Sequence, residues 1–454
     1  MVPPLDPGFR PIAAGNRAYQ AAVRASAKKL PIAIALERES GSISRYDTEI
    51  LPPTGESAAD TFCYVERLVK FLLWQHGGWR VVVGGPPEIG AYIQTAYSAS
   101  GPRAFDCRFL GTVYQKKFQV DAVRQEDVPA PRESPVALGG HLEGCRIGFD
   151  LGASDYKIAA VMDGQAIYTE EIPWDPKVQP DPDWHYNKIN DGLMRAASKM
   201  PRVDGIGGSA AGIYINNAVM AASLFRAVPE KLFVEKVRPL FLRMQKQWGV
   251  PLEVANDGDV TALAGGMSLQ AQRVLGCAMG SSEAAGFLNG DGQITGWLNE
   301  LAFAPVDYNP DAAVEEWSTD RGVGALYFSQ QAVARLAPAA KINLPPAHQA
   351  IQLQFVQDLH QKNDARAEMI FETIGMYLGY TIAYYAGMYD CRHLLILGRV
   401  TSGKSGDVIL DKANEVLKTE FPDTAEAVAL HLPDEKMKRV GQAVAAASLP
   451  IIRK

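Results

Sequence analysis

The sequence predicts an α/β protein in which two buried strands each lead into a turn of small residues. One strand begins at Ile147, and the other spans Val274–Ala278. The turns that follow them contain Gly152, Ala153 and Ser154 in the first case, and Gly280, Ser281 and Ser282 in the second. Small residues let backbone N–H groups approach a phosphate closely. Asp150 lies beside the first turn, and its carboxylate can hold the water shell of Mg²⁺.

Two phosphate-type turns that face each other across a cleft are typical of the actin-like (ribonuclease H-like) ATPase fold, which has two lobes. We therefore predict a lobe I over residues 146–255, which the C-terminal helix at about 438–450 joins, and a lobe II over residues 256–437. A charged segment rich in Pro and Gly, residues 124–144, is a predicted linker. It separates lobe I from an additional N-terminal α/β region, residues 1–140.

The N-terminal region is predicted to contain a lead-in, a hairpin, a helix and further strands. Prolines near the start oppose a helix, so residues 1–30 are expected to be loosely held. Two β runs around Ser40-Gly41 indicate a hairpin. Apolar residues at helical spacing predict a helix over residues 57–76. Residues 108–120 are expected to form a pair of strands.

A weak similarity within the chain raises the possibility of an internal repeat. Residues 32–52 and 157–173 both contain a strand, a glycine turn, a second strand and then a Glu-Ile pair. The first block is therefore expected to be a degenerate relative of the hairpin that opens lobe I.

The start of lobe II carries the residues that point most clearly to chemistry. An apolar strand, Val250–Ala255, runs into Asn256-Asp257-Gly258-Asp259 and then into a helix of small residues. An aspartate at the tip of a strand, directly before a helix, is where enzymes commonly present a general base. We assign that role to Asp257, for which the other interpretation is an N-cap. For Asp259, a cap and a chemical role are equally supported.

Composition limits the classes of function. The chain has 454 residues and a net charge of −6, which opposes a nucleic-acid partner. Its five cysteines form no C-x-x-C pair, which fits reduced thiols in the cytoplasm and offers no zinc cage. The first residues lack the apolar stretch of a signal peptide, and no apolar run approaches the ~20 residues that span a bilayer. We expect a soluble cytoplasmic protein with no membrane contact.

Several segments, in order, resemble the ROK (repressor, open reading frame, kinase) family of the hexokinase and actin superfamily. The resemblance covers roughly residues 146–450. It is carried by GFDLG (148–152), IGGSAAGIYIN (206–216), EVANDGDVTALAG (253–265), LGCAMGSSEAAGFLNGDGQITGWLNELAF (275–303), LILGRVTSG (395–403) and GQAVAAAS (441–448). These segments are similar to the family's phosphate, sugar and adenosine motifs. No single segment is decisive, but five such segments in the right order and spacing are strong support for the resemblance.

The resemblance implies a kinase that transfers the γ-phosphoryl of Mg-ATP to a hexose-type sugar. Asp257 would be the general base, and Asn256, Glu300 and Glu315 would hydrogen-bond sugar hydroxyls. For Glu315, a carboxylate that favours the start of a helix is the other interpretation. Gly398 and Arg399 lie in the segment that resembles the adenosine turn. A small-molecule sugar partner and a homodimer are also expected.

Four departures from the family pattern affect these expectations. Ala153-Ser154 replaces Gly-Thr in the first turn, and two extra residues, Asp155-Tyr156, follow it. Phe303 stands where the family has a histidine that binds sugar and zinc. The cysteine-rich zinc run is replaced by residues 307–317, so we expect no structural zinc. Arg399 stands where the family has glycine, where it could clash with adenine or stack on it.

Three hypotheses for function remain open at this point. The first is the carbohydrate kinase, which the carboxylate at Asp257 favours. The second is a non-catalytic protein of the same fold that binds sugar or nucleotide and acts through its N-terminal region. The third is an ATPase that activates a reductase, which the scattered cysteines oppose. A repressor is disfavoured because the N-terminal region has no helix-turn-helix pattern.

Overall fold

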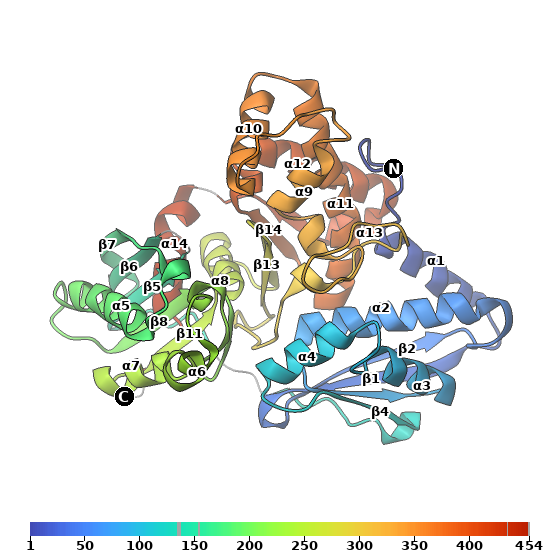
Figure 1. Cartoon of the computed structure of the whole chain (residues 1–454), viewed down its shortest axis with the longest axis horizontal. Coiled ribbons are helices and arrows are strands. Elements are labelled where there is room, and N and C mark those ends of the chain that lie inside the picture. Colours follow the sequence, from blue (N-terminus) through green and yellow to red (C-terminus); the bar gives the residue numbers. More distant parts are fainter. Residues whose placement is uncertain (134–137, 153–154, 434, 453–454) are drawn as a thin grey trace.

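The computed structural model describes residues 1–133, 138–152, 155–433 and 435–452, and for 435–440 only the backbone. Within these residues the strands form four sheets, of which three define the regions of the molecule in Figure 1. The structure has the α/β class and the actin-like arrangement that the sequence predicts. The exact division at residues 140, 146, 255 and 437 stays a prediction. No helix of the described chain is long and apolar enough to cross a membrane.

The N-terminal region contains a four-stranded sheet in the order β2-β1-β3-β4. Its strands are β1 (Leu30–Glu37), β2 (Ile43–Ile50), β3 (Arg80–Gly84) and β4 (Gln119–Val123). Its helices are α1 (Ile12–Ala25), α2 (Ala58–His76), α3 (Pro87–Ala96) and α4 (Ala104–Val113). The predicted hairpin is confirmed as β1 and β2, and the predicted helix as α2. The predicted strand pair over residues 108–120 is wrong, because the chain there ends α4 and only then begins β4.

Lobe I is built on a five-stranded sheet in the order β11-β8-β5-β6-β7. Its strands are β5 (Cys145–Leu151), β6 (Asp155–Met162), β7 (Gln165–Pro173), β8 (Gly205–Ala210) and β11 (Leu252–Asn256). The helices α5 (Pro182–Ala197), α6 (Glu230–Leu232), α7 (Leu240–Trp248) and α14 (Glu435–Ala447), and a small hairpin of β9 (Ile213–Ile215) and β10 (Ala218–Ala221), complete it. The two blocks of the predicted repeat each form an antiparallel hairpin, β1 with β2 and β6 with β7. The relationship between the two hairpins stays a prediction.

Lobe II has a four-stranded sheet in the order β13-β12-β14-β15. Its strands are β12 (Val274–Met279), β13 (Glu283–Leu288), β14 (His393–Leu397) and β15 (Ala429–His431). Its helices are α8 (Asp257–Leu269), α9 (Gln330–Leu336), α10 (Gln349–Gln361), α11 (Ala365–Tyr389), α12 (Lys404–Glu420) and α13 (Pro422–Ala427). The tyrosines of α11 are core residues, as expected: Tyr377, Tyr380, Tyr384, Tyr385 and Tyr389 are all buried.

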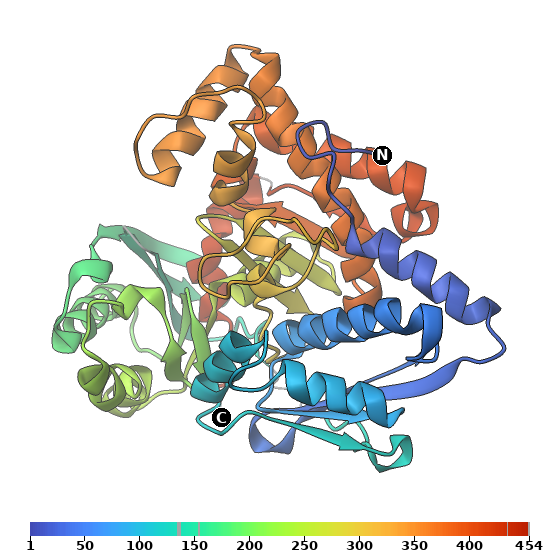
Figure 2. The ribbon, with the colours of Figure 1, turned by 45° about the vertical axis from the view of Figure 1, so that its right-hand side comes forward.

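The N-terminal region packs against lobe II, as Figures 1 and 2 both show in blue beside yellow and orange. The first residues are not loosely held, contrary to the prediction. Phe9 is buried with its ring centroid 4.6 Å from that of Tyr377 on α11. The backbone N–H of Arg10 donates to Asp307 Oδ1 at 2.9 Å. The prolines do oppose a helix there, but contacts with residues some 300 positions later hold this segment in place.

Helix α14 lies against the sheet of lobe I so closely that two strands need glycine. A Cβ atom at Gly148 would overlap the carbonyl oxygen of Ala443, and one at Gly207 would overlap that of Ala446. Other residues of α14 share a buried apolar cluster with α8, which includes Val260. Helices α8 and α14 thereby connect the two lobes.

We expect Gly207→Ala to lower the free energy of unfolding by about 2 kcal/mol or more, because the added methyl group meets backbone atoms that cannot move aside. Gly387→Ala in α11 is the matched control, since nothing lies within 4 Å of its Cβ position. It should be neutral or stabilising by up to about 1 kcal/mol. Urea titration of both variants measures the difference, and equal effects would contradict the close packing of α14.

Candidate active site

Asp257 is the first residue of α8, at the point where β11 of lobe I ends and lobe II begins. The N-cap of this helix is Asn256, whose Oδ1 accepts a hydrogen bond from the Gly258 amide at 2.7 Å. The Asn256 Nδ2 donates to the Gly212 carbonyl at 2.7 Å. The cap that sequence reasoning could place at Asp257 or Asp259 therefore belongs to Asn256. This leaves the half-buried Asp257 at the positive end of the helix, and burial raises its pKa.

Asp259 points away from Asp257 and has a structural role. It is buried, and its Oδ1 accepts hydrogen bonds from Asn299 Nδ2 at 2.9 Å and from the Phe287 amide at 3.4 Å. Burial raises its pKa to about 7. Asp259 thus joins α8 to β13 and to the segment that carries Glu300.

Glu300 lies near Asp257, as the resemblance implies. Burial and the negative charge of Asp257 raise the pKa of the Glu300 carboxyl to about 8. The same charge adds to the effect of burial on Tyr214, whose pKa is also raised. Glu300 and Tyr214 are therefore both neighbours of Asp257 at the start of α8.

Glu315 is oriented differently from the expectation. It lies in a turn rather than before a helix, so the expected helix start at this position is wrong. Its carboxylate accepts hydrogen bonds from the Ser318 amide at 2.6 Å, from the Ser318 hydroxyl at 2.7 Å and from the Trp317 amide at 3.1 Å. These bonds within its own turn occupy the side chain that was expected to face a sugar.

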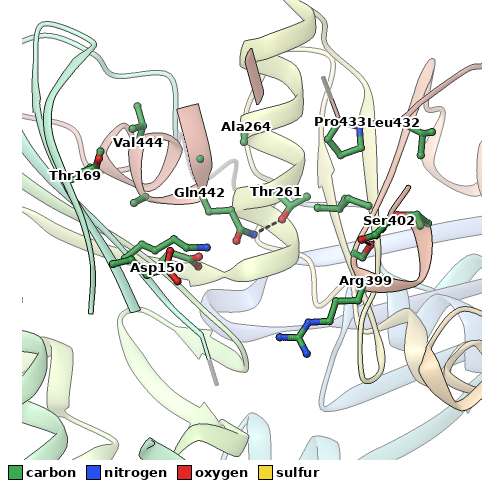
Figure 3. Close-up of a pocket in the computed structure, with 18 of the residues that line it drawn as sticks. Asp150, Thr169, Thr261, Ala264, Arg399, Ser402, Leu432, Pro433, Gln442 and Val444 are labelled. Carbon is green, nitrogen blue, oxygen red and sulfur yellow. Dashed lines mark hydrogen bonds between the residues drawn. The ribbon is translucent and has the colours of Figure 1, made fainter. Parts of the chain in front are cut away.

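A cavity of about 990 Å³ separates the two lobes, and three of the predicted nucleotide-site residues line it (Figure 3). Asp150 of β5 lines it from lobe I, and Gly398 and Arg399 line it from lobe II. Thr261 of α8 and Gln442 of α14 lie between them, joined by a hydrogen bond. Gln442 Nε2 also donates to the carbonyl oxygen of Asp257 at 3.0 Å.

Asp150 is only 9% exposed, and its Oδ1 accepts a hydrogen bond from the Ser209 hydroxyl at 2.7 Å. Burial raises the pKa of Asp150 to about 6, and the charge of Asp257 adds to this rise. Its position fits the predicted contact with hydrated Mg²⁺. Within the described residues, no three His, Cys, Asp or Glu side chains form a group that could hold a metal ion.

The second predicted phosphate turn is a tight turn, whereas the first lies partly outside the described residues. In the first, the Gly152 amide donates to the Asp155 carbonyl at 3.0 Å; Ala153 and Ser154 lie outside the described residues. In the second, the Gly280 amide donates to the Ser282 carbonyl at 3.0 Å, and Ser281 and Ser282 are exposed. Gly398 has a φ of +103°, and a side chain there would overlap Met279, directly before the second turn.

Two cations face the cavity, and sequence reasoning missed one of them. Lys157 of β6 is the cross-strand partner of Asp150, so both side chains lie on the same face of the sheet. Arg399 extends into the cavity toward the side where Asp150 lies (Figure 3). Within the described chain, neither side chain forms an ion pair or donates a hydrogen bond. The hairpin register around the first turn is the signal that could have identified Lys157.

Glu283 is a second residue that sequence reasoning missed. It follows the second phosphate turn directly and is 2% exposed in an otherwise apolar strand. The Cys277 thiol donates to its Oε1 at 3.6 Å, and its Oε2 has no partner in the described structure. Burial and the charge of Glu300 raise its pKa to about 8. A charged residue inside an apolar strand was the available signal.

Comparison with known proteins identifies the fold. No protein-family model and no curated protein matches the chain. Among solved structures, a ROK hexokinase from Thermus thermophilus matches with a TM-score of 0.52 and 17% identity, over 66% of this chain and 97% of that one. A ROK family transcriptional regulator, homologous to the E. coli MLC protein, matches with a TM-score of 0.54 and 18% identity. The match covers 68% of this chain and 79% of that one. This chain has the ROK fold.

A third structure with the ROK fold is a ROK family protein from Streptococcus pneumoniae, solved in complex with sucrose. It matches with a TM-score of 0.50 and 9% identity, over 67% of this chain and 96% of that one. Identities this low establish the fold alone. Each match covers about two thirds of this chain, so about a third of the chain lies outside the shared ROK fold.

The raised pKa of Glu283 makes a prediction about stability. The folded protein keeps a proton on this carboxyl up to about pH 8, whereas an unfolded glutamate loses it near pH 4.3. The stability that Glu283 contributes is therefore complete below about pH 4.3 and is lost as the pH rises to about 8. Glu283→Gln cannot ionise, so its melting temperature should fall less than that of the wild type between pH 5 and pH 8. Between pH 5 and pH 8, we expect the wild type to lose at least about 1 kcal/mol more free energy of unfolding than Glu283→Gln does.

The exposed Glu88 provides the control, because Glu88→Gln should leave the pH dependence of the melting temperature unchanged. If Glu283→Gln and the wild type lose stability in parallel, Glu283 is not a protonated buried acid.

Proposed function

We propose that this chain is a member of the ROK family and a sugar kinase, which transfers the γ-phosphoryl group of Mg-ATP to a hydroxyl of a hexose-type sugar. The observation that carries the proposal is the position of Asp257. It lies at the start of α8, close enough to Glu300 and to Asp150 that its charge adds to the effect of burial in raising the pKa of both. A single carboxylate is thus a neighbour of the expected sugar site and of the expected phosphate site.

The residues around the cavity fit a magnesium-bound nucleotide. Its anionic phosphates match the side chains of Lys157 and Arg399 on opposite walls, two cations that have no ion-pair partner among the described residues. The Mg²⁺ ion would supply charge neutralisation on the phosphates, with Asp150 holding its water shell. Gly398 would leave room for the adenosine, and Arg399 would meet the phosphates rather than block the base.

The chemistry assigned to this chain is proton transfer and positioning. Asp257 would accept the proton of the attacking sugar hydroxyl, and its raised pKa makes it a stronger base once it is ionised. Glu300 and Asn256 would orient the sugar through its other hydroxyls. Lys157 and Arg399 would hold the phosphoryl group in line for attack, which is the main contribution that a phosphotransferase makes.

The second candidate is a non-catalytic sugar- or nucleotide-binding protein that acts through its N-terminal region. Phe303 in place of a polar residue and the inward-turned Glu315 favour it, because both remove contacts with a sugar. One of the structures with the ROK fold is a transcriptional regulator. The two candidates differ in one result: only the kinase releases ADP in response to a sugar.

A cytoplasmic location and a homodimer remain predictions. Light scattering measures the oligomeric state.

We expect sugar-dependent release of ADP from purified protein with Mg-ATP, tested over hexoses, amino sugars, sugar acids and polyols. Asp257→Asn should lower kcat by about 10³-fold or more with the sugar that responds, because the variant cannot accept the proton. The exposed Asp191 supplies the control, since Asp191→Asn should keep full activity. Binding of ATP and sugar without any turnover would replace the kinase with the second candidate.

We expect Lys157→Met to raise the KM for ATP by about tenfold or more and to leave the KM for the sugar within twofold. The methionine keeps the apolar stem and removes only the charge that faces the cavity. Lys28→Met changes an exposed lysine of the N-terminal region and should alter neither constant. An unchanged KM for ATP in Lys157→Met would remove Lys157 from the nucleotide site.

A further inference from the structure

We infer that the N-terminal region positions the sugar side of the active site through helix α2, in the place where the resembling family uses a metal-bound loop. The inference rests on the proposed function, because it names the part of the chain that orders the sugar-binding segments. Two segments are concerned. Residues 298–303 carry Glu300, and residues 315–320 carry Glu315.

The first contact is between the end of α2 and the backbone of residues 298–300. The last carbonyl groups of a helix have no partners within the helix and must find them elsewhere. In α2, the carbonyls of Trp74, Gln75 and His76 accept hydrogen bonds from three consecutive amides. The pairs are Glu300 to Trp74 at 3.0 Å, Asn299 to Gln75 at 2.9 Å and Leu298 to His76 at 3.3 Å. The end of α2 therefore sets the backbone that presents Glu300.

The contact continues from Asn299 to the helix of the general base. Asn299 has a φ of +50°, a left-handed conformation that non-glycine residues adopt only when their surroundings hold them. It is 3% exposed, its Nδ2 donates to Asp259 Oδ1 at 2.9 Å, and its Oδ1 accepts from the Tyr389 hydroxyl at 3.0 Å. Asp259 lies two residues after Asp257. One path of hydrogen bonds thus runs from α2 through Asn299 to the start of α8.

Aromatic packing fills the space beside this path. The Trp74 side chain is fully buried, and its ring centroid lies 4.6 Å from that of Phe303. Phe105 and Phe109 of the N-terminal region also contact Phe303, with centroids at 5.5 and 6.3 Å. The Trp74 indole N–H donates to Asp106 at 2.9 Å, which fixes the ring in one orientation. Phe303, which stands where the family has histidine, is therefore an anchor for the N-terminal region.

The second segment is held by a buried group of charges. The Asp320 carboxylate forms salt bridges with three cations of the N-terminal region. They are Lys70 at 3.0 Å, Arg67 at 3.1 Å and Arg103 at 2.6 Å. Lys70 is 0% exposed and also contacts Asp106 at 3.1 Å. Such pairs add little net stability, but they fix geometry, because removing one partner leaves a buried charge uncompensated. Helix α2, through Lys70 and Trp74, thus holds both segments.

The nucleotide side depends less directly on α2. Within the described residues, the lining of the 990 Å³ cavity includes no residue of the N-terminal region, although Leu394 and Ile396 of β14 share an apolar cluster with Trp74. A weakened contact with α2 should therefore disturb the sugar side and leave the nucleotide side intact. General instability would change both sides together.

The test compares three variants of the full chain by hydrogen–deuterium exchange. Trp74→Ala removes the aromatic anchor, and Lys70→Met removes the charge from the ion group while keeping the stem. Ile93→Ala is the matched control, because Ile93 is equally buried in the N-terminal region but belongs to another apolar cluster. We expect amides 298–300 to exchange at least tenfold faster in Trp74→Ala, and amides 315–320 to do so in Lys70→Met. Residues 147–151, which carry Asp150 and belong to an apolar cluster without N-terminal residues, should be unchanged.

The inference is overturned if Ile93→Ala speeds exchange in residues 298–300 as much as Trp74→Ala does. It is also overturned if Trp74→Ala leaves residues 298–300 unchanged and Lys70→Met leaves residues 315–320 unchanged. Should Trp74→Ala fail to fold, Trp74→Phe takes its place, since it keeps a ring and loses only the bond to Asp106. This readout needs no turnover, so it decides the inference even if no sugar is ever phosphorylated. Where turnover exists, the KM for the sugar should rise at least tenfold with the KM for ATP within twofold. Parallel changes in both would show a merely structural role.

Discussion

The crowding of carboxyl groups at the start of α8 is the constraint on which the rest of the site depends. Burial raises the pKa values of Asp150 and Glu300, and the charge of Asp257 adds to both; burial and the charge of Glu300 likewise raise the pKa of Glu283. Four neighbouring acids, two of them buried and two half-buried, cannot all ionise at low cost in such a place. The protein meets this cost partly with the positive end of α8 and partly by keeping protons on the most buried members.

This constraint explains why the cavity contains cations that have no partner in the described structure. Lys157 and Arg399 face the cavity from both lobes, and the charge of Lys157 opposes the rise in the pKa of Asp150. A ligand that carries phosphates and a divalent cation would pair with both kinds of charge at once. The proposed function accordingly assigns a charged ligand to the space between the lobes and a hydroxyl-bearing ligand to the space beside Asp257 and Glu300.

The N-terminal region gives the site its second support. A loop can be held by a bound metal or by packing against a neighbouring element, and both fix the same backbone. Here Trp74 and Phe303 supply packing, and Lys70 with Asp320 supplies fixed charge. The loss of the family's cysteines and histidine and the presence of an additional region are, on this account, two parts of one change.

The sequence predicted the parts of the site that depend on neighbouring residues. Asp257 and the turn at Gly280 could be predicted to follow strands because an apolar run precedes each of them, and the structure has β11 and β12 there. Glu315 was misplaced because its partners, Trp317 and Ser318, form a turn that only the folded loop creates.

Residues 108–120 were expected as strands because aromatic residues favour strands, whereas burial of Leu110 and Val113 against the sheet selects a helix. The roles of α2 and of the first residues could not be predicted, because their partners lie more than 200 positions away along the chain.

A crystal structure of the full chain with Mg²⁺ and a non-hydrolysable ATP analogue tests the central claim most directly. The account predicts a polyphosphate between the turn at Gly280–Ser282 and the side chains of Lys157 and Arg399, with adenosine beside Gly398. The metal should lie within one water of Asp150. A nucleotide bound outside this cavity, or a cavity that stays empty at saturating analogue while the crystals remain intact, would contradict it.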